Sequence, residues 1–357
     1  MNPDTTVKES VSGPADLFNM ADRCLLTPYE IDIDRLQQVF GQILTHQIDY
    51  ADLYFQYSRT EGWVLEEGIV KFNINDNITK EVTKFYTESP FPNYKTNDDK
   101  STILEKGDKN YLTSKFKNFI GYKKDILEVG CGTGQLAIYF ALGTNNKVVG
   151  VDPTIESLKL ASDFSNKNNI QNIDFVNADI FDDVLKDNFF DFIWCNGVLH
   201  HTKDPYGAFK ILIKSLKKEG YLLIGLYNRI GRTRTIVRKY MCKIFGIHIL
   251  NILDPTLRNL KDNEEEKKAW IRDQYLHPVE SLHTIDEVLK WFEENNIEFI
   301  NSIPSSDFDE SNEDNLFVKK SKGTLFSRIV NQLSMIFNNL GADGGLFIVI
   351  GKKIEQN

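Results

Sequence analysis

The chain has 357 residues, of which 41% are hydrophobic and 26% are charged. This composition is too rich in apolar residues for a chain that is disordered as a whole, and the length suffices for one large domain plus a smaller one. The formal net charge of -9 argues against non-specific adhesion of the whole surface to nucleic acid or anionic lipid. We therefore expect small molecules or specific macromolecular sites as ligands, and no contact with a membrane.

Two further features concern the cellular compartment. The sequence has no run of eighteen apolar residues, and residues 1–12 lack the basic-then-apolar pattern of a signal peptide. The four cysteines form no CxxC pair, so neither a zinc site nor a disulfide framework is indicated. We expect a cytoplasmic protein with reduced thiols and no bound metal.

The first 75 residues differ from the rest of the chain. Helical spacing at 31–46 is followed by a strand-like stretch at 51–73 with turn signals at 59–62 and 66–68. We interpret residues 1–75 as a small α+β module placed ahead of a main domain at 76–357.

From Lys123 onward, apolar runs alternate with segments of helical periodicity, which predicts an α/β, doubly wound, Rossmann-like sheet with helices on both faces. We expect seven strands, of which the last is antiparallel. The predicted strands are 125–129, 147–151, 173–177, 190–195, 221–227, 298–303 and 346–350. The predicted helices are 135–142, 155–165, 208–216 and 285–295, and residues 217–220 are predicted as a turn.

Two long segments interrupt this alternation, at 229–283 and at 305–344. Both exceed the length of plain loops, so we expect lids or helical insertions there.

A glycine-rich turn follows the first predicted strand. Glu128 to Gly134 (EVGCGTG) ends that strand and opens a helix, so its backbone can turn sharply and approach a ligand closely. Asp152 ends the next strand, where a carboxylate can accept hydrogen bonds from both hydroxyls of a ribose, and Asp179 follows the third. In a doubly wound sheet these residues meet at the carboxyl edge beside the topological switch point, where ligands bind.

The segments EVGCGTG, VVGVD, NADI and DFIWCNGVLHH resemble successive motifs of the class I S-adenosylmethionine (SAM) dependent methyltransferases, over about residues 85–353. The resemblance implies that SAM is the cofactor, that Glu128 holds its ammonium group, and that Asp152 holds its ribose hydroxyls. Asp179 would accept a hydrogen bond from the adenine amino group, and Ile180 would pack against the adenine ring. The glycine turn and the end of the fourth strand would lie alongside the methionine portion of SAM. The residues implied for that portion are Gly130, Cys131, Gly132, Gly134, Asn196 and Gly197.

A dehydrogenase that binds a dinucleotide is the main alternative for such a turn. Its fingerprint requires a glycine where Gln135 stands, and it gives no role to Glu128 or Asp179.

Methyl transfer from a sulfonium needs alignment of the reactants, exclusion of water and sometimes removal of a proton. His200 and His201 follow the fourth strand, and either imidazole could serve as general base. We favour His201, because the comparable histidine of ubiquinone-type O-methyltransferases falls there, and we expect it to titrate near its ordinary pKa of about 6.5. The alternative is that both histidines only pack the loop.

Aromatic side chains are predicted around the mouth of the site. Tyr86, Tyr94, Tyr227 and Tyr275 are the substrate-contacting candidates, with lid packing as the alternative. His277, Glu280 and His283 resemble a metal set, but their loop context favours a polar network between lid and core.

Residues 43–71 resemble the amino-terminal segment of TldD-type metalloproteases. No HExxxH motif occurs in the chain, so the resemblance does not imply protease activity. The segment could be a fused module that binds a protein partner or a remnant of a gene fusion.

Three functions remain open from the sequence. The first is methylation of a small-molecule acceptor. The second is methylation of RNA or protein, for which the basic run at 229–239 is the only support, although such a run more often forms the solvated face of a helix. The third is a SAM-binding regulatory partner subunit.

Overall fold

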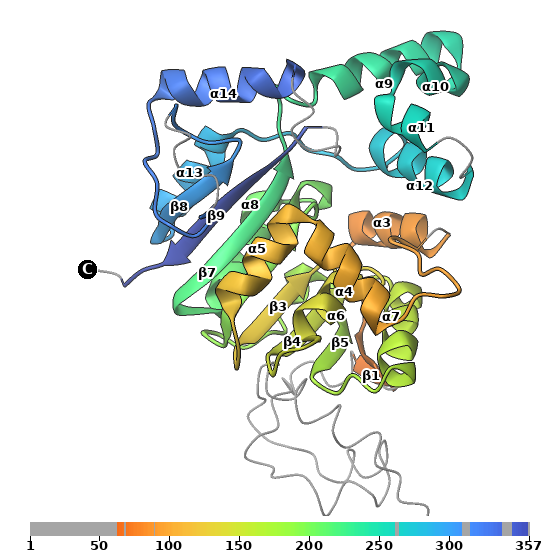
Figure 1. Cartoon of the computed structure of the whole chain (residues 1–357), viewed down its shortest axis with the longest axis vertical. Coiled ribbons are helices and arrows are strands. Elements are labelled where there is room, and N and C mark those ends of the chain that lie inside the picture. The colour runs from red at the N-terminus through yellow and green to blue at the C-terminus, as the bar shows by residue number, and fades with distance from the viewer. Residues whose placement is uncertain are drawn as a thin grey trace, which may run out of the picture.

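The computed structural model describes residues 63–67, 69–88, 90–260, 264–308, 315–337 and 345–355. This part of the chain contains one nine-stranded sheet in the order β1-β2-β5-β4-β3-β6-β7-β9-β8 (Figure 1). The strands are β1 (Trp63–Glu66), β2 (Ile69–Phe72), β3 (Asp125–Val129), β4 (Lys147–Asp152), β5 (Ile173–Asn177), β6 (Phe190–Asn196), β7 (Leu216–Tyr227), β8 (Ile297–Ile303) and β9 (Leu346–Lys353).

The order of the strands reverses at β3. Strands β4 and β5 extend the sheet to one side of β3, and β6 and β7 extend it to the other, all in parallel. Strand β9 is antiparallel to both β7 and β8, as expected for the last strand. The carboxyl ends of β3 and β6 therefore flank a topological switch point, which is where ligands bind in open sheets of this kind.

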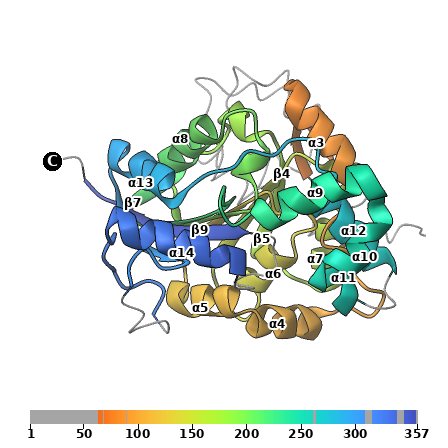
Figure 2. The ribbon, with the colours of Figure 1, turned by 90° about the horizontal axis from the view of Figure 1, so that it is seen from above.

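Helices cover both faces of the sheet, so β3, β4 and β5 are buried along almost their whole length (Figure 2). On one face, α5 (Tyr111–Ile120), α6 (Gln135–Ala141) and α7 (Ile155–Lys167) bury side chains such as Phe116 and Phe140. On the other face, α8 (Pro205–Ser215) and α13 (Ile285–Glu294) bury Phe209 and Phe292. These two layers make the fold doubly wound.

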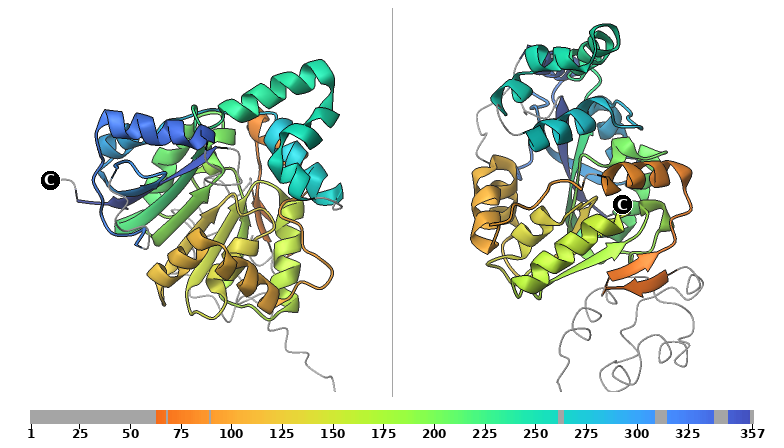
Figure 3. Two further views of the ribbon diagram at one scale, coloured as in Figure 1. Left: turned by 45° about the horizontal axis from the view of Figure 1, so that its top comes forward. Right: turned by 90° about the vertical axis from the view of Figure 1, so that its right-hand side faces the viewer.

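Of the remaining helices, α4 packs against α5 and α6, and the others lie beside or beyond the carboxyl edge (Figure 3). Residues 229–283 form a helical insertion, as expected, and α14 lies within 305–344. The elements are α3 (Asn77–Thr87), α4 (Lys100–Lys109), α9 (Thr233–Phe245), α10 (Leu250–Leu253), α11 (Pro255–Asn259), α12 (Glu264–Tyr275) and α14 (Leu325–Phe337), with short 3₁₀ turns η4 (Ile180–Asp182), η5 (Leu199–His201) and η6 (Ile247–Ile249).

The expected count of seven strands is wrong, because β1 and β2 form a hairpin that joins the same sheet through β5. Val70 pairs with Val176 and Lys71 with Asn177, in parallel. The expected turn at 217–220 is also wrong, because these residues lie within β7. The pairing of β6 with β7 shifts register opposite them, from Phe190–Leu216 to Phe192–Tyr221, and Glu219 in this bulge has a positive φ.

The hairpin bears on the boundary expected at residue 75. A cut there would remove two strands of the sheet, so we propose that the main domain includes β1 and β2 and begins no later than Trp63. The helix predicted at 31–46 and most of the TldD-like segment lie outside the described residues. Among the helices that the structure describes, none is long and apolar enough to cross a membrane.

We predict that a chain starting at Asp76 will unfold at a lower temperature than a chain starting at Trp63, by at least about 5 °C in thermal denaturation. The shorter chain loses Ile69, Val70 and Phe72, which are buried, and each such side chain contributes roughly 1.5–3 kcal/mol. The full chain is the reference. Equal unfolding temperatures for the two truncated chains would show that the hairpin is not part of the folding unit.

Candidate active site at the carboxyl edge of the sheet

The turn between β3 and α6 is held close to the end of β4. The backbone N–H groups of Gly130 and Cys131 donate to the Val151 carbonyl, at 2.8 and 3.2 Å. Gly132 has a φ of +53°, and a Cβ there would lie 2.3 Å from the Phe91 carbonyl oxygen. Glycine is therefore required, and residues 91–94 lie directly over the turn.

Asp152 joins the loops that follow β3 and β4. Its Oδ2 accepts from the Gly132 N–H and its Oδ1 from the Thr154 N–H, both at 2.8 Å. Burial raises the pKa of this carboxyl, and the two backbone donors oppose that shift. Each carboxylate oxygen retains a second lone pair, so the group can also accept hydroxyl hydrogens from a ligand in the cavity.

Two buried polar atoms at this edge accept no hydrogen bond from the described residues. They are Oε2 of Glu128 and Oδ1 of Asn196, at the ends of β3 and β6. Burial also raises the pKa of Glu128 well above its ordinary value. A cationic ligand beside Glu128 would satisfy its free oxygen and keep the carboxylate ionised, so the site fits the ammonium group of SAM.

Asp179 follows β5 and caps η4, where its Oδ1 accepts from the Phe181 N–H at 3.0 Å. Ile180 is the next residue along the same wall. Both residues line the cavity described next, and their contact with an adenine ring stays a prediction from the resemblance.

A cavity of about 450 Å³ runs along this edge, between the strand ends and helices α3 and α12. Most of the candidate residues line it, namely Tyr86, Glu128, Gly130, Cys131, Gly132, Asp152, Asp179, Ile180, Asn196, Gly197, His201 and Tyr227. The sequence motifs therefore converge on one cavity. Four carboxylates line it, counting Asp273, and its described lining contains neither lysine nor arginine.

Asp273 and Trp270 of α12 are lining residues that the sequence analysis missed. Asp273 accepts from the Tyr86 hydroxyl at 3.1 Å and from the Gln274 amide at 2.8 Å. Burial raises the pKa of Asp273 above its ordinary value. The only sequence signal was the position of these residues in the long insertion, because their proximity to β3 depends on how that insertion folds back.

A buried arginine supports this end of the cavity from behind. Arg232 is fully buried, its guanidinium lies 3.6 Å from the centre of the Tyr227 ring, and it forms an ion pair with Glu280 at 2.9 Å. Lys239 also pairs with Glu280. The three residues expected to form one polar network have different partners. Glu280 pairs with Arg232 and Lys239, His277 contacts the Val279 carbonyl, and His283 contacts Ser281 and Glu287. Among the described residues, no group of three or more His, Cys, Asp or Glu side chains is arranged to hold a metal ion.

His200, His201 and His277 are buried, and burial favours the neutral form of each ring. Nδ1 of His201 lies 2.6 Å from the Val279 carbonyl, which can only accept, so this nitrogen carries the proton and Nε2 has the free lone pair. Burial lowers the pKa of His201 to about 3 and that of His277, stacked on it at 3.6 Å, to about 4. The expectation that His201 titrates near 6.5 is therefore wrong.

Four candidates do not line the cavity. His200 is fully buried under Tyr227, neither of its ring nitrogens bonds to a described residue, and burial lowers its pKa well below the ordinary value. Gly134 packs against Phe175 as the start of α6. Tyr94 donates to the Thr133 carbonyl and stacks on Phe164, which holds the turn. Tyr275 instead donates to Asp254 within the insertion.

Comparisons with known proteins concern the same part of the chain. A family model described as a methyltransferase domain matches residues 121–296. An uncharacterized protein of Synechococcus is 28% identical over 217 residues, which cover 54% of this chain and 51% of that protein. A tRNA U34 carboxymethyltransferase of Sulfurimonas denitrificans is 25% identical over 203 residues, 46% of this chain and 65% of that protein.

The matches cover less than two thirds of the length of each of these relatives. Among solved structures, PKMT2 of Rickettsia typhi in complex with AdoHcy is 14% identical with a TM-score of 0.46, over 66% of this chain and 49% of that one. The doubly wound fold and the motif set define the class I type. Residues 121–296 are a methyltransferase domain of this type, and its cofactor is S-adenosylmethionine.

The amino-terminal resemblance rests on a short match. A metalloprotease TldD homolog of Haemophilus influenzae is 46% identical over 55 residues, which are 15% of this chain and 11% of that protein.

We predict that Asp152→Ala will weaken SAM binding by about 1–3 kcal/mol in isothermal titration, because a charge-assisted acceptor is lost and the Gly132 N–H loses its partner. Asp163→Ala, which removes an exposed carboxylate from the adjacent helix α7, is the matched control. An affinity that stays at the control value would refute the ribose assignment.

We predict that stability falls as the pH is lowered from about 6.5 toward 4, because the lowered pKa values of His200, His201 and His277 mean that only the unfolded chain takes up their protons there. His200→Phe should reduce this slope by up to about 1.4 kcal/mol per pH unit in urea unfolding. The comparison variant is His248→Phe, which alters an exposed ring. The assignment fails if both variants keep the wild-type slope.

Proposed function

We propose that this chain transfers the methyl group of SAM to a small-molecule acceptor that is neutral or positively charged. The observation that carries the proposal is the single cavity at the carboxyl edge, with Glu128, Asp152 and Asp179 toward the strand ends and Asp273 on the facing helix. SAM supplies an electrophilic methyl group on a sulfonium. The residues of the chain align the acceptor, exclude water and remove its proton.

The lining supports this class of acceptor. An anionic acceptor would face four carboxylates without a lysine or arginine in the described lining, and such like-charge contacts are unfavourable at close range. A hydroxyl or amine acceptor can instead donate to Asp273 and rest on the rings of Tyr86 and Tyr227, with Trp270 as a further aromatic wall.

Asp273 is the better general base of the two groups available. A base works best when its pKa lies near the operating pH, and burial raises the pKa of Asp273 while it lowers that of His201 to about 3. His201 then acts as a hydrogen-bond acceptor through Nε2, and it can accept from a second N–H of an amine or from another hydroxyl of the substrate while the reacting group donates to Asp273.

Methylation of RNA or protein is the second candidate, and the relative described as a tRNA U34 carboxymethyltransferase favours it. The basic run gives it less support than the sequence suggested. Arg232 and Lys239 are paired with Glu280, and Arg234 donates to the Ile336 carbonyl. A SAM-binding regulatory subunit is the third candidate, and it would bind SAM without turnover.

A labelled-methyl assay on fractionated small molecules, run beside the same assay on RNA and protein, separates these functions. We expect labelled product in neutral or cationic small-molecule fractions. Label found only in RNA or protein would replace the proposal with the second candidate, and SAM binding without labelling in any fraction would replace it with the third.

Once the assay has identified a methyl acceptor, we predict that Asp273→Asn will lower turnover by about a hundredfold to ten-thousandfold while SAM affinity stays within about twofold of wild type. The wild-type rate should fall on the acid side through the raised pKa of Asp273, and the variant should lose that limb. His201→Ala is the comparison variant. If it abolishes turnover while Asp273→Asn does not, the base is His201, and the assignment to Asp273 is wrong.

A further inference from the structure

The side-chain amide of Gln274, on α12, has partners for both its oxygen and its nitrogen. Its Oε1 accepts from the Arg232 guanidinium, and its Nε2 donates to the Asp273 carboxylate at 2.8 Å and to the Tyr227 hydroxyl at 3.0 Å. Turning the amide over would point Oε1 at the carboxylate and the N–H groups at the guanidinium, and both contacts would be unfavourable. Since Gln274 is also buried, its amide is fixed in one orientation.

The Arg232 guanidinium that fixes this amide is itself held on several sides. It donates to the two carboxylate oxygens of Glu280 at 3.1 and 2.9 Å, and to the Gln274 backbone carbonyl at 3.0 Å. Its face lies against the Tyr227 ring. The planar fork of arginine suits this set of partners, and the single ammonium of lysine does not. Arg232 is fully buried and does not line the cavity, so any effect on the cavity passes through its neighbours.

The two oxygens of Asp273 have partners of different kinds. Oδ2 accepts from the fixed amide of Gln274, and Oδ1 accepts from the Tyr86 hydroxyl at 3.1 Å. An amide N–H can only donate, whereas a hydroxyl can donate or accept. Oδ1 can therefore take up a proton and keep Tyr86 as its partner, while a proton on Oδ2 would weaken the bond from an amide that cannot turn away.

Charged and titratable groups around Asp273 come from several neighbouring elements. They are Tyr86 of α3, Tyr227 at the end of β7, Arg232 before α9 and Glu280 after α12. Burial raises the pKa of both tyrosines, so they remain neutral hydroxyls. Arg232 and Glu280 form an ion pair and have opposite effects on Asp273. Burial raises the pKa of Asp273, and the hydrogen bond from Gln274 opposes that rise.

We propose that Gln274 and Arg232 are positioning residues for Asp273, and that they leave Oδ1 as the oxygen that receives the proton of the methyl acceptor. Arg232 fixes the amide of Gln274, and the amide holds Oδ2 and stabilises the ionised carboxylate. The role of Asp273 as base rests on the proposed function. The chain of hydrogen bonds and its effect on the pKa of Asp273 do not, so the two can be tested separately.

An NMR titration of the full chain tests the positioning without a methyl acceptor. The protein is labelled with ¹³C at the aspartate carboxyl carbons, and the Asp273 signal is the one that Asp273→Asn removes. Gln274→Leu should raise the pKa of Asp273 by at least about 1, because a donor to the ionised form is lost. Arg232→Lys keeps the positive charge but frees the amide, so it should also raise this pKa. If the buried lysine prevents folding, Gln274→Leu alone decides.

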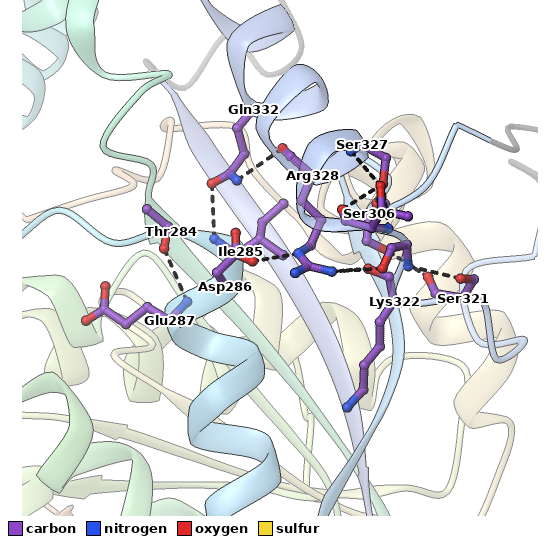
Figure 4. A network of polar contacts seen from close by, with 12 residues as sticks. Thr284, Ile285, Asp286, Glu287, Ser306, Ser321, Lys322, Ser327, Arg328 and Gln332 are labelled. Carbon is purple, nitrogen blue, oxygen red and sulfur yellow. Dashed lines mark hydrogen bonds and ion pairs between the residues drawn. The ribbon is translucent and has the colours of Figure 1, made fainter.

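Gln332 provides the matched control, because it is a second buried glutamine with a bonded amide. Figure 4 shows it between α14 and α13, where Oε1 accepts from the Ile285 N–H at 3.1 Å and Nε2 donates to the Arg328 carbonyl. It does not line the cavity. Gln332→Leu should lower the unfolding temperature but leave the pKa of Asp273 unchanged. An unchanged pKa in Gln274→Leu, or an equal rise in Gln332→Leu, overturns the proposal.

Turnover tests the second half of the proposal once a methyl acceptor is identified. In Gln274→Leu the acid limb of the pH–rate profile should move to higher pH together with the pKa of Asp273, and the rate above that limb should stay within about tenfold of wild type. A rate lowered equally at every pH would show that Gln274 is only structural. If the pKa of Asp273 rises but the limb stays in place, Asp273 is not the base, and the role given to Oδ1 is wrong.

Discussion

The site depends most on the Asp152 carboxylate, which accepts hydrogen bonds from the backbone N–H groups of Gly132 and Thr154. It joins the glycine turn after β3 to the loop after β4, so the two loops that flank the cofactor side of the cavity cannot move independently. The segment at 91–94 then packs on the turn so closely that a Cβ at Gly132 would collide with it. Burial raises the pKa of Asp152 and so disfavours its ionised form, whereas the two backbone N–H donors stabilise the carboxylate.

The sheet was largely predictable because its central strands are apolar runs bounded by turn residues, and their order follows from short right-handed connections. The glycine turn and the three carboxylates were predictable for the same reason, since strand ends define the edge where they meet. The hairpin β1–β2 was recognisable as strands, but its place in the sheet was not, because the pairing of Val70 with Val176 spans about a hundred residues and leaves no local pattern.

The residues proposed to act on the methyl acceptor could not be assigned from the sequence alone. His200 and His201 are adjacent in the chain, yet one is sealed under Tyr227 and the other lines the cavity, and burial shifts the pKa of both away from neutrality. A residue type suggests a role, but its surroundings decide the protonation state. Asp273 and Tyr275 are two residues apart on α12, and only the fold of the insertion turns Asp273 toward the cavity while Tyr275 bonds to Asp254.

The two helices over the cavity, α3 and α12, are anchored unequally. Lifting α12 would separate Gln274 from Arg232, a guanidinium that is fully buried and whose partners would have to be replaced by water. Helix α3 has no fully buried residue, and it meets α12 mainly through the Tyr86–Asp273 contact and the bond from Arg272 to the Phe85 carbonyl. Outward movement of α3 would therefore disrupt less buried structure than lifting α12 would.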